Sequence, residues 1–452
     1  MPVSPARSAA FDVLLRVDRE HAYAAELLHS IQYRNHSTQD HGLATELVMG
    51  VLRWRSLLDQ EISKASITTL QKLDLEVLTA LRLAAYQLLF LDRVPARAAV
   101  NESVELVKRS RKRSAIPFAN AVLRKLSVRL PELRNEMFSV HAKSTLQLAD
   151  TCAHPQWLLE RWVHQYGDSV AKAICGYDQK IPGTSIRLAS PELEAELLTE
   201  GVQLAPGKLL TSARRIQSGD VTKTAAFRKG LVSIQDEASQ LVALLVGKAP
   251  TILDCCAAPG GKTRILAERN PDAKVFAMEL HPHRARLLRK LVPAANVQVI
   301  AGDAFHVPTQ ALFERVLVDV PCSGTGTLAR NPEIKWRLTI EDIADLQRRQ
   351  SGILQSAMSC VAPGGRLIYS TCSLEREENS DVVEKAIQAD GSFQVLNCLD
   401  ILEDLRSEGE LALKQEDTTS ISSGAYLQTI PGSYHCDGFF AAVLEKKQGT
   451  PD

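Results

Sequence analysis

Short apolar runs alternate with helix-length amphipathic segments through the second half of the chain, and this alternation limits the possible folds more than any other feature. We expect strands over residues 252–255, 275–279, 297–301, 315–319, 366–370 and 439–444. Helices are expected over residues 237–246, 284–291 and 340–360. Such alternation predicts a mostly parallel, doubly wound α/β sheet of the Rossmann-like type. In these sheets a ligand binds at the carboxyl ends of the strands.

The first third of the chain has a different pattern, because its apolar residues recur at the spacing of helices, as they do through residues 78–89. We expect one helix over residues 102–107, capped by Asn101, and another over residues 118–126. The stretch from 150 to 235 mixes one helix with short strand-like runs and several Gly and Pro residues. A region of that kind is typical of a small α+β unit.

These patterns predict a multidomain chain, and the length of 452 residues suggests about three domains. We expect an all-α domain over residues 1–145, a small α+β connecting domain over 146–235, and the Rossmann-like domain over 236–448.

The charges are balanced overall but not along the chain. There are 53 Lys and Arg residues and 53 Asp and Glu residues, so any binding to a polyanion must use a local patch. Ten cations and two acids lie between Arg93 and Arg129, and the densest part is the run from Lys108 to Arg113. This run is either a solvated loop or a phosphate contact, since Lys and Arg displace the counterions of nucleic acids.

The cysteine pattern and the hydropathy exclude several classes of protein. The nine cysteines include no CxxC pair, so we expect neither a disulfide framework nor a metal site. The apolar run from Val77 to Leu91 is too short to span a bilayer and contains Arg82. The N-terminal region has no apolar signal core. We therefore expect a cytoplasmic protein that does not bind membranes.

The first three expected strands end in residues suited to a nucleoside. A small-residue loop follows Asp254, and its sequence matches neither a Walker loop nor GxGxxG. Its residues are Cys256, Ala257, Ala258, Pro259, Gly260, Gly261 and Lys262. Glu279 ends the next strand and Asp303 follows the third. Carboxylates at these places accept hydrogen bonds from ribose hydroxyls or an adenine amino group, which predicts a nucleoside cofactor without phosphate.

The last two of these strand ends each carry a cysteine. Asp319 is followed by Val-Pro-Cys322-Ser-Gly-Thr-Gly, and the other strand runs into Ser-Thr-Cys372-Ser. A lone cysteine is usually inert and buried, and we interpret Cys152, Cys175, Cys360 and Cys398 in that way. Two cysteines at the edge where ligands bind instead favour nucleophilic chemistry.

The strings DCCAAPGGKT, DVPCSGTG and STCSLEREEN are similar to those of the RNA (cytosine-5-)-methyltransferases that use S-adenosyl-L-methionine. Together with an N-terminal region that resembles NusB-like RNA-binding domains, the chain resembles the bacterial 16S ribosomal RNA methyltransferases of the RsmB (Sun/Fmu) family. The resemblance covers nearly the whole chain. The chain departs from the family pattern at two places. Relatives more often have Asp where this chain has Glu279, and they have a more basic stretch where this chain has residues 329–332.

This resemblance implies a fold, a reaction and a partner. The cofactor would be S-adenosyl-L-methionine, held by the loop from Cys256 to Lys262 and by Glu279, Asp303 and Asp319. Cys372 would be the nucleophile that adds to C6 of the base, Cys322 would act in product release, and Asp319 would contact the base. The substrate would be 16S ribosomal RNA, and the protein would be a monomer.

Three alternatives remain at this stage. The same chemistry could act on tRNA or on large-subunit rRNA, because the motifs report the reaction and not the choice of RNA. A non-catalytic RNA-binding or assembly factor is disfavoured by the two strand-end cysteines. A nicotinamide-dependent oxidoreductase is disfavoured by the lack of GxGxxG.

Overall fold

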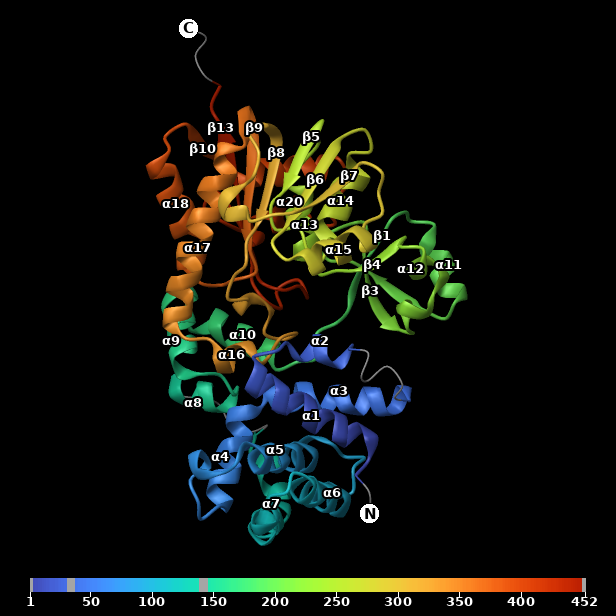
Figure 1. The fold of residues 1–452 in the computed structure, drawn as a ribbon, viewed down its shortest axis with the longest axis vertical. Helices are drawn as coiled ribbons and strands as arrows, with labels where there is room; N and C mark the ends of the chain where they lie inside the picture. Colours follow the sequence, from blue (N-terminus) through green and yellow to red (C-terminus); the bar gives the residue numbers. More distant parts are fainter. Residues whose placement is uncertain (1–2, 31–36, 138–144, 449–452) are drawn as a thin grey trace. The chain divides into compact units, whose positions relative to one another are not determined.

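The computed structural model describes residues 3–30, 37–137 and 145–448 (Figure 1). By its contacts the chain divides into two compact units. The helical unit comprises Met1–Ile181 and Leu328–Arg337, and the sheet unit comprises Pro182–Thr327 and Leu338–Asp452. The contacts thus group residues 146–181 with the first unit and 182–235 with the second. The three-part division expected from the sequence remains a prediction.

The described part of the helical unit is built from α-helices joined by short turns. They are α1 (Pro5–Glu20), α2 (Ala24–Leu28), α3 (Thr38–Arg53), α4 (Arg55–Ala65), α5 (Leu75–Phe90), α6 (Ala96–Arg109), α7 (Ile116–Met137), α8 (Thr145–Thr151), α9 (Gln156–Tyr166), α10 (Asp168–Asp178) and α16 (Ile334–Arg337). The apolar faces of α1, α3, α5, α6 and α7 form one core, which confirms the all-helical prediction for this region. None of the helices in the described residues is long and apolar enough to cross a bilayer.

Both helices expected in this unit are longer than predicted: the one expected over residues 102–107 is α6 (Ala96–Arg109), and the one expected over residues 118–126 is α7 (Ile116–Met137). Asn101 was expected to cap a helix, but it lies inside α6, which begins directly after Pro95. Pro95 has the extended conformation of a helix N-cap, with φ of −60° and ψ of 131°. Proline fixes φ near this value and cannot donate a backbone hydrogen bond, so the helix starts five residues before Asn101.

A segment from the second half of the chain packs into the helical unit. It is Leu328–Arg337, six residues after Cys322 in the sequence, and it includes α16. Glu333 Oε1 accepts a hydrogen bond from the backbone N–H of Ala24 at 2.9 Å, and the fully buried Lys335 donates to the carbonyl of Arg53 at 3.0 Å. The stretch at residues 329–332, where the family pattern differs, is therefore part of this packed segment.

The described residues of the sheet unit contain two sheets and the helices that cover them. The strands are β1 (Ser185–Leu188), β2 (Gln203–Pro206), β3 (Ala213–Ser218), β4 (Val232–Ile234), β5 (Thr251–Asp254), β6 (Lys274–Glu279), β7 (Val297–Ala301), β8 (Phe313–Asp319), β9 (Val361–Thr371), β10 (Phe393–Leu396), β11 (Ser422–Ser423), β12 (Tyr426–Thr429) and β13 (Phe439–Lys446). The helices are α11 (Leu193–Thr199), α12 (Ala225–Arg228), α13 (Glu237–Leu244), α14 (Gly261–Arg269), α15 (Pro282–Leu291), α17 (Ile340–Ser359), α18 (Ser380–Ala389), α19 (Cys398–Ser407) and α20 (Gln415–Thr418).

The larger sheet has a parallel part and an antiparallel part. Its order is β11-β12-β13-β9-β8-β5-β6-β7, and β10 pairs with β13. Strands β5, β6, β7, β8 and β9 are parallel to one another, as the alternating pattern predicts. The next strand, β13, pairs with β9 in the antiparallel direction. The smaller antiparallel sheet, β2-β3-β1-β4, lies in the region expected to mix helices and strands.

Both faces of the central strands of the larger sheet are buried. Successive residues of one strand enter different cores: Ile252 packs on the side of α13, α14 and α19, and Leu253 packs on the side of α17 and α18. Leu317 and Val318 of β8 divide in the same way. Strands buried on both faces read as continuous apolar runs, which is why they could be recognised in the sequence. The carboxyl ends of these strands remain available for polar residues.

A close contact in the helical unit gives a test of its core. A Cβ atom placed on Gly50 of α3 would meet the ring of Tyr86 at 1.9 Å, whereas one on Gly42 of the same helix meets nothing within 4 Å. We predict that Gly50→Ala lowers the free energy of unfolding by about 1–3 kcal/mol because it overpacks the core. The matched control Gly42→Ala should raise it by up to about 1 kcal/mol, since alanine favours helix. Urea unfolding measures both, and equal effects of the two substitutions would contradict this packing.

Candidate active site

Four carboxylates gather around the loop that follows β5. The pKa of the Cys256 thiol is raised by burial and, further, by the negative charges of Asp254, Asp319, Glu279 and Asp303. These acids come from the ends of β5, β8, β6 and from just after β7. The parallel sheet therefore brings together the residues that the sequence placed at separate strand ends.

The loop turns sharply into α14. Gly260 has φ of +113°, which side chains disfavour, and a Cβ atom there would lie 2.6 Å from Leu288. Gly261 then begins α14, with Lys262 and Thr263 in its first turn. Glycine is thus required at position 260 both for the backbone conformation and for the close packing of the turn against Leu288 and Val292.

Glu279 and Asp303 are held by the backbone that follows each of them. Glu279 Oε1 accepts a hydrogen bond from the N–H of His281 at 3.0 Å, and Arg284 lies 3.7 Å from the same oxygen. Asp303 Oδ1 accepts from the N–H of Phe305 at 2.9 Å. These carboxylates are acceptors for hydroxyl and amino groups and would repel a phosphate. The residues present fit a nucleoside cofactor without phosphate.

Asp319 is fixed from both sides. Its Oδ2 accepts a hydrogen bond from Lys262 Nζ at 2.7 Å, and its Oδ1 accepts from Ser370 Oγ at 2.8 Å. Lys262 also lies over the ring of Phe439, 5.1 Å from the centroid. Lys262 therefore balances the charge of Asp319 at the edge of the sheet, a contact that could not be read from the sequence.

The two strand-end cysteines are in direct contact. Cys322 Sγ and Cys372 Sγ lie 3.2 Å apart, and the backbone N–H of Cys372 donates to Cys322 Sγ at 3.3 Å. Both residues are partly exposed. The pKa of Cys322 is raised because its thiol hydrogen-bonds to Cys372 and because its surroundings are buried. Cys322 therefore keeps its proton more firmly than a free cysteine does.

A buried polar network supports both cysteines. It consists of Ser323, Ser373, Glu378 and Gln350, with Asn379 and Thr371 beside it. Sequence reasoning assigned no role to these residues. Glu378 sits in a run with Glu375 and Glu377, which in a sequence resembles a solvated acidic turn. Its position a few residues after Cys372 was the only available signal.

The cationic run lies in the helical unit, at the end of α6. Lys108 pairs with Glu105 at 3.2 Å, and Lys112 pairs with Asp74 at 2.9 Å. Arg111 and Arg113 are exposed. A cavity of about 540 Å³ opens here, lined by Val3, Glu105, Lys108, Arg109, Arg111 and Arg113. The residues of this run thus line a mainly positive hollow and do not form an extended loop.

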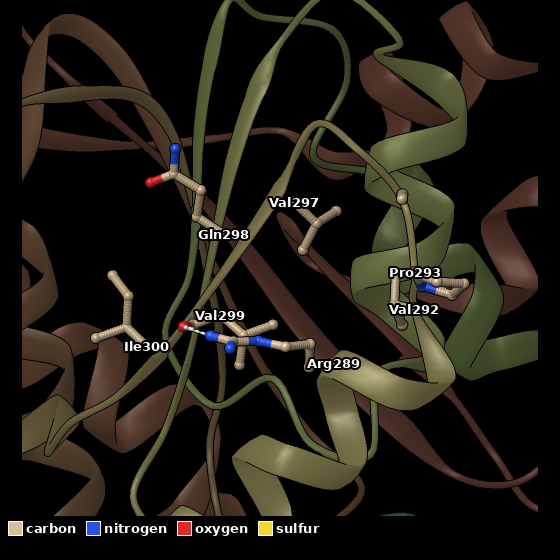
Figure 2. Close-up of a pocket in the computed structure, with 8 residues that line it drawn as sticks. Arg289, Val292, Pro293, Val297, Gln298, Val299 and Ile300 are labelled. Atoms are coloured by element: carbon tan, nitrogen blue, oxygen red, sulfur yellow. Dashed lines mark hydrogen bonds between the residues drawn. The ribbon is translucent and has the colours of Figure 1, made fainter.

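A second cavity, of about 560 Å³, lies at the edge of the larger sheet (Figure 2). It is formed by β7 and the end of α15, and none of the residues expected to bind cofactor or base lines it. Arg289 crosses it and donates a hydrogen bond to the carbonyl of Val299 at 3.1 Å. Arg289 thereby covers part of the unpaired strand edge.

Comparisons with known proteins show the family to which the chain belongs. Residues 242–445 match the model of the 16S rRNA methyltransferase RsmB/F family, and residues 4–128 match that of the NusB family. The chain is 33% identical to a Bacillus subtilis protein named "Probable ribosomal RNA small subunit methyltransferase B", with 99% of this chain and 100% of that protein covered. The chain belongs to the RsmB/F family. It is 33% identical to the Vibrio cholerae ribosomal RNA small subunit methyltransferase B, over 90% of each chain.

Solved structures show the same fold. The crystal structure of PH0851 covers 99% of this chain and 100% of its own, with a TM-score of 0.75 and 23% identity. A methyltransferase homologue from Pyrococcus horikoshii covers 68% of this chain and 100% of its own, with a TM-score of 0.55 and 25% identity. The chain is thus a methyltransferase that combines a NusB-like helical region with a Rossmann-like domain, as its motifs predict.

The buried Asp254 predicts a pH dependence of stability. Burial raises its pKa to about 7, while a hydrogen bond from Thr263 opposes this shift. The folded protein then binds a proton between about pH 4 and pH 7 that the unfolded chain releases. The free energy of unfolding should therefore fall as the pH rises through this range, by up to about 1.4 kcal/mol per pH unit from this group.

Asp254→Asn should remove this contribution, so its urea-unfolding midpoint should depend less on pH than that of the wild type. Asp272→Asn, which changes an exposed acid, should retain the wild-type slope. Parallel pH curves for wild type and Asp254→Asn would contradict the raised pKa.

Proposed function

We propose that this methyltransferase transfers a methyl group from S-adenosyl-L-methionine to C5 of one cytosine in 16S ribosomal RNA, through a covalent bond between Cys372 and C6 of the base. The observation that carries this proposal is the 3.2 Å contact of two thiols beside a carboxylate-lined loop. The substrate follows from the family and from relatives named ribosomal RNA small subunit methyltransferase B.

The cofactor would lie along the loop from Cys256 to Lys262. Glu279 would accept hydrogen bonds from the ribose hydroxyls and Asp303 one from the adenine amino group. Asp319 would border the methionine end. When bound, this cofactor supplies an electrophilic methyl group.

Cys372 would act first, because cytosine C5 is a poor nucleophile. Addition of the Cys372 thiolate to C6 makes C5 electron-rich, so C5 can attack a methyl carbon. Asp319 would accept a hydrogen bond from the amino group of the base and keep the ring oriented as its electrons move. Its two bonds, from Lys262 and Ser370, hold the carboxylate still for this purpose.

Cys322 would act last. After transfer, the proton at C5 passes to water as the base, its C–H electron pair re-forms the C5–C6 double bond, and the bond from C6 to Cys372 breaks so that Cys372 leaves as a thiolate. The Cys322 thiol, 3.2 Å from Cys372 Sγ, is close enough to assist this elimination by donating a hydrogen bond to the departing thiolate. The raised pKa of Cys322 suits it to keep its proton and not to compete as the nucleophile.

The base must leave any stack to reach the two thiols, which costs least for an unpaired cytosine. The NusB-like region would supply the remaining contacts to the RNA. Its positive hollow around Arg111 and Arg113 suits phosphate groups, which position an RNA without reading its sequence.

The roles of the two cysteines can be tested in cells that lack the protein. Bisulfite sequencing should find one 16S cytosine that is protected by the wild-type protein and unprotected with Cys372→Ala. Purified Cys322→Ala should accumulate an RNA–protein adduct on a denaturing gel, because the elimination is slowed. An adduct with Cys372→Ala in place of Cys322→Ala would reverse the two roles. Protection only in tRNA or in large-subunit rRNA would reject the proposed substrate.

The RNA interaction has its own test. Replacing Lys108, Arg109, Arg111, Lys112 and Arg113 by Gln should weaken RNA binding and reduce its salt dependence, by roughly 0.7–0.9 in log–log slope for each phosphate that is no longer neutralised. The control replaces Arg16 and Arg19, two other exposed cations of the helical unit, by Gln. If both variants keep the wild-type slope, the run is a solvated surface.

A further inference from the structure

A buried acid, Glu378, lies between two loops: the one that follows β8 and carries Cys322, and the one that follows β9 and carries Cys372. Glu378 ends the short 3₁₀ turn Arg376–Glu378, between β9 and α18, and its exposed fraction is 0%. Burying a carboxylate is costly unless donors satisfy it. In the part of the chain that the structure describes, these donors are hydrogen-bonding groups and not a Lys or Arg.

The hydrogen bonds of Glu378 reach both loops. Oε1 accepts from the backbone N–H of Ser323 at 2.8 Å and from Gln350 Nε2 at 2.8 Å. Oε2 accepts from Ser373 Oγ at 2.5 Å and from Ser323 Oγ. Ser323 directly follows Cys322, and Ser373 directly follows Cys372. One carboxylate therefore holds the residue next to each thiol.

The network has little freedom to rearrange. Ser323 Oγ and Ser373 Oγ are 3.0 Å apart, and both serines are buried. Gln350, on α17, also donates to the carbonyl of Pro321 at 3.0 Å, so the same helix supports the Cys322 loop twice. Gln350 Oε1 is buried without a hydrogen-bond partner, but the carboxylate oxygens of Glu378 and the hydroxyls of Ser323 and Ser373 are all hydrogen-bonded. These bonds favour one arrangement of the two loops.

We propose that Glu378 is a positioning residue, which keeps Cys322 against Cys372 and is therefore required for release of the methylated RNA. This inference rests on the proposed function, since it assumes that Cys322 assists elimination from Cys372. The hydrogen bonds of Glu378 go to neither sulfur, so it acts through Ser323 and Ser373. The negative charge of Glu378 also contributes to the raised pKa of Cys322.

The test compares two substitutions at this position. Glu378→Ala removes all four hydrogen bonds and frees the Cys322 loop, so turnover should fall at least about tenfold, the effect of losing about 1.4 kcal/mol. The covalent RNA adduct should accumulate at the same time, as with Cys322→Ala. Glu378→Gln can keep all four hydrogen bonds, because its amide oxygen accepts from the two N–H groups and its NH₂ donates to the two serine oxygens. It should restore turnover to within about threefold of wild type.

Further variants keep the test decisive. Glu384→Gln, at an exposed acid of α18, should behave as wild type. If Glu378→Ala does not fold, Ser323→Ala and Ser373→Ala each remove one side-chain hydrogen bond to Glu378 and should raise the steady-state adduct fraction severalfold. Wild-type adduct levels in both serine variants, or normal release in a folded Glu378→Ala protein, would overturn the proposal. Absence of any adduct in Cys322→Ala would instead reject the proposed function, so the two failures can be distinguished.

Discussion

The contact between Cys322 and Cys372 is the interaction on which the proposed chemistry depends, and the pairing of two parallel strands produces it. Asp319 of β8 is in register with Ser370 of β9. Each strand ends at or close to this pair, and its cysteine follows within a few residues. The sulfur atoms then meet at 3.2 Å. A shift of one residue in this register would turn the side chains to the opposite face and separate the thiols.

The same sheet edge gathers negative charge. Asp254, Glu279, Asp303 and Asp319 all act on the Cys256 thiol, and Asp319 accepts a hydrogen bond from a lysine that partly balances this charge. The cost of burying an acid at this edge is visible at Asp254, whose pKa is raised to about 7 by burial and, to a smaller extent, by the charge of Asp319. Natural proteins accept such local strain at ligand sites. Here it favours a ligand that offers hydroxyl and amino donors and disfavours one that carries phosphate.

The parts of the fold that could be predicted are those with a local signal. A continuous apolar run predicted β7 over its full length, Val297–Ala301, although this edge strand is exposed to half-buried. The apolar runs of the more buried strands β6 and β8 placed their ends at Glu279 and Asp319. The cysteines and acids of the site followed from their places after these strands. The family motifs then supplied the reaction.

What the sequence could not reveal depends on tertiary contacts. Glu378 stands among acids and has the pattern of an exposed turn, yet its side chain is buried and hydrogen-bonds to Ser323, 55 residues away in the sequence, as well as to the nearby Ser373. Leu328–Arg337 carries no pattern that would assign it to the helical unit. The helix start after Pro95 was missed because Asn101 is a good cap in isolation, whereas the proline already satisfies the geometry of a helix start.

The most direct measurement replaces the target cytosine of a 16S rRNA fragment by 5-fluorocytosine and identifies the linked peptide by mass spectrometry. Fluorine at C5 cannot leave as a proton, so the adduct should persist after methyl transfer. The peptide that contains Cys372 should carry the mass of the methylated, fluorinated nucleotide. The same mass on the peptide that contains Cys322, or no linked peptide despite binding of the RNA and the cofactor, would contradict the account.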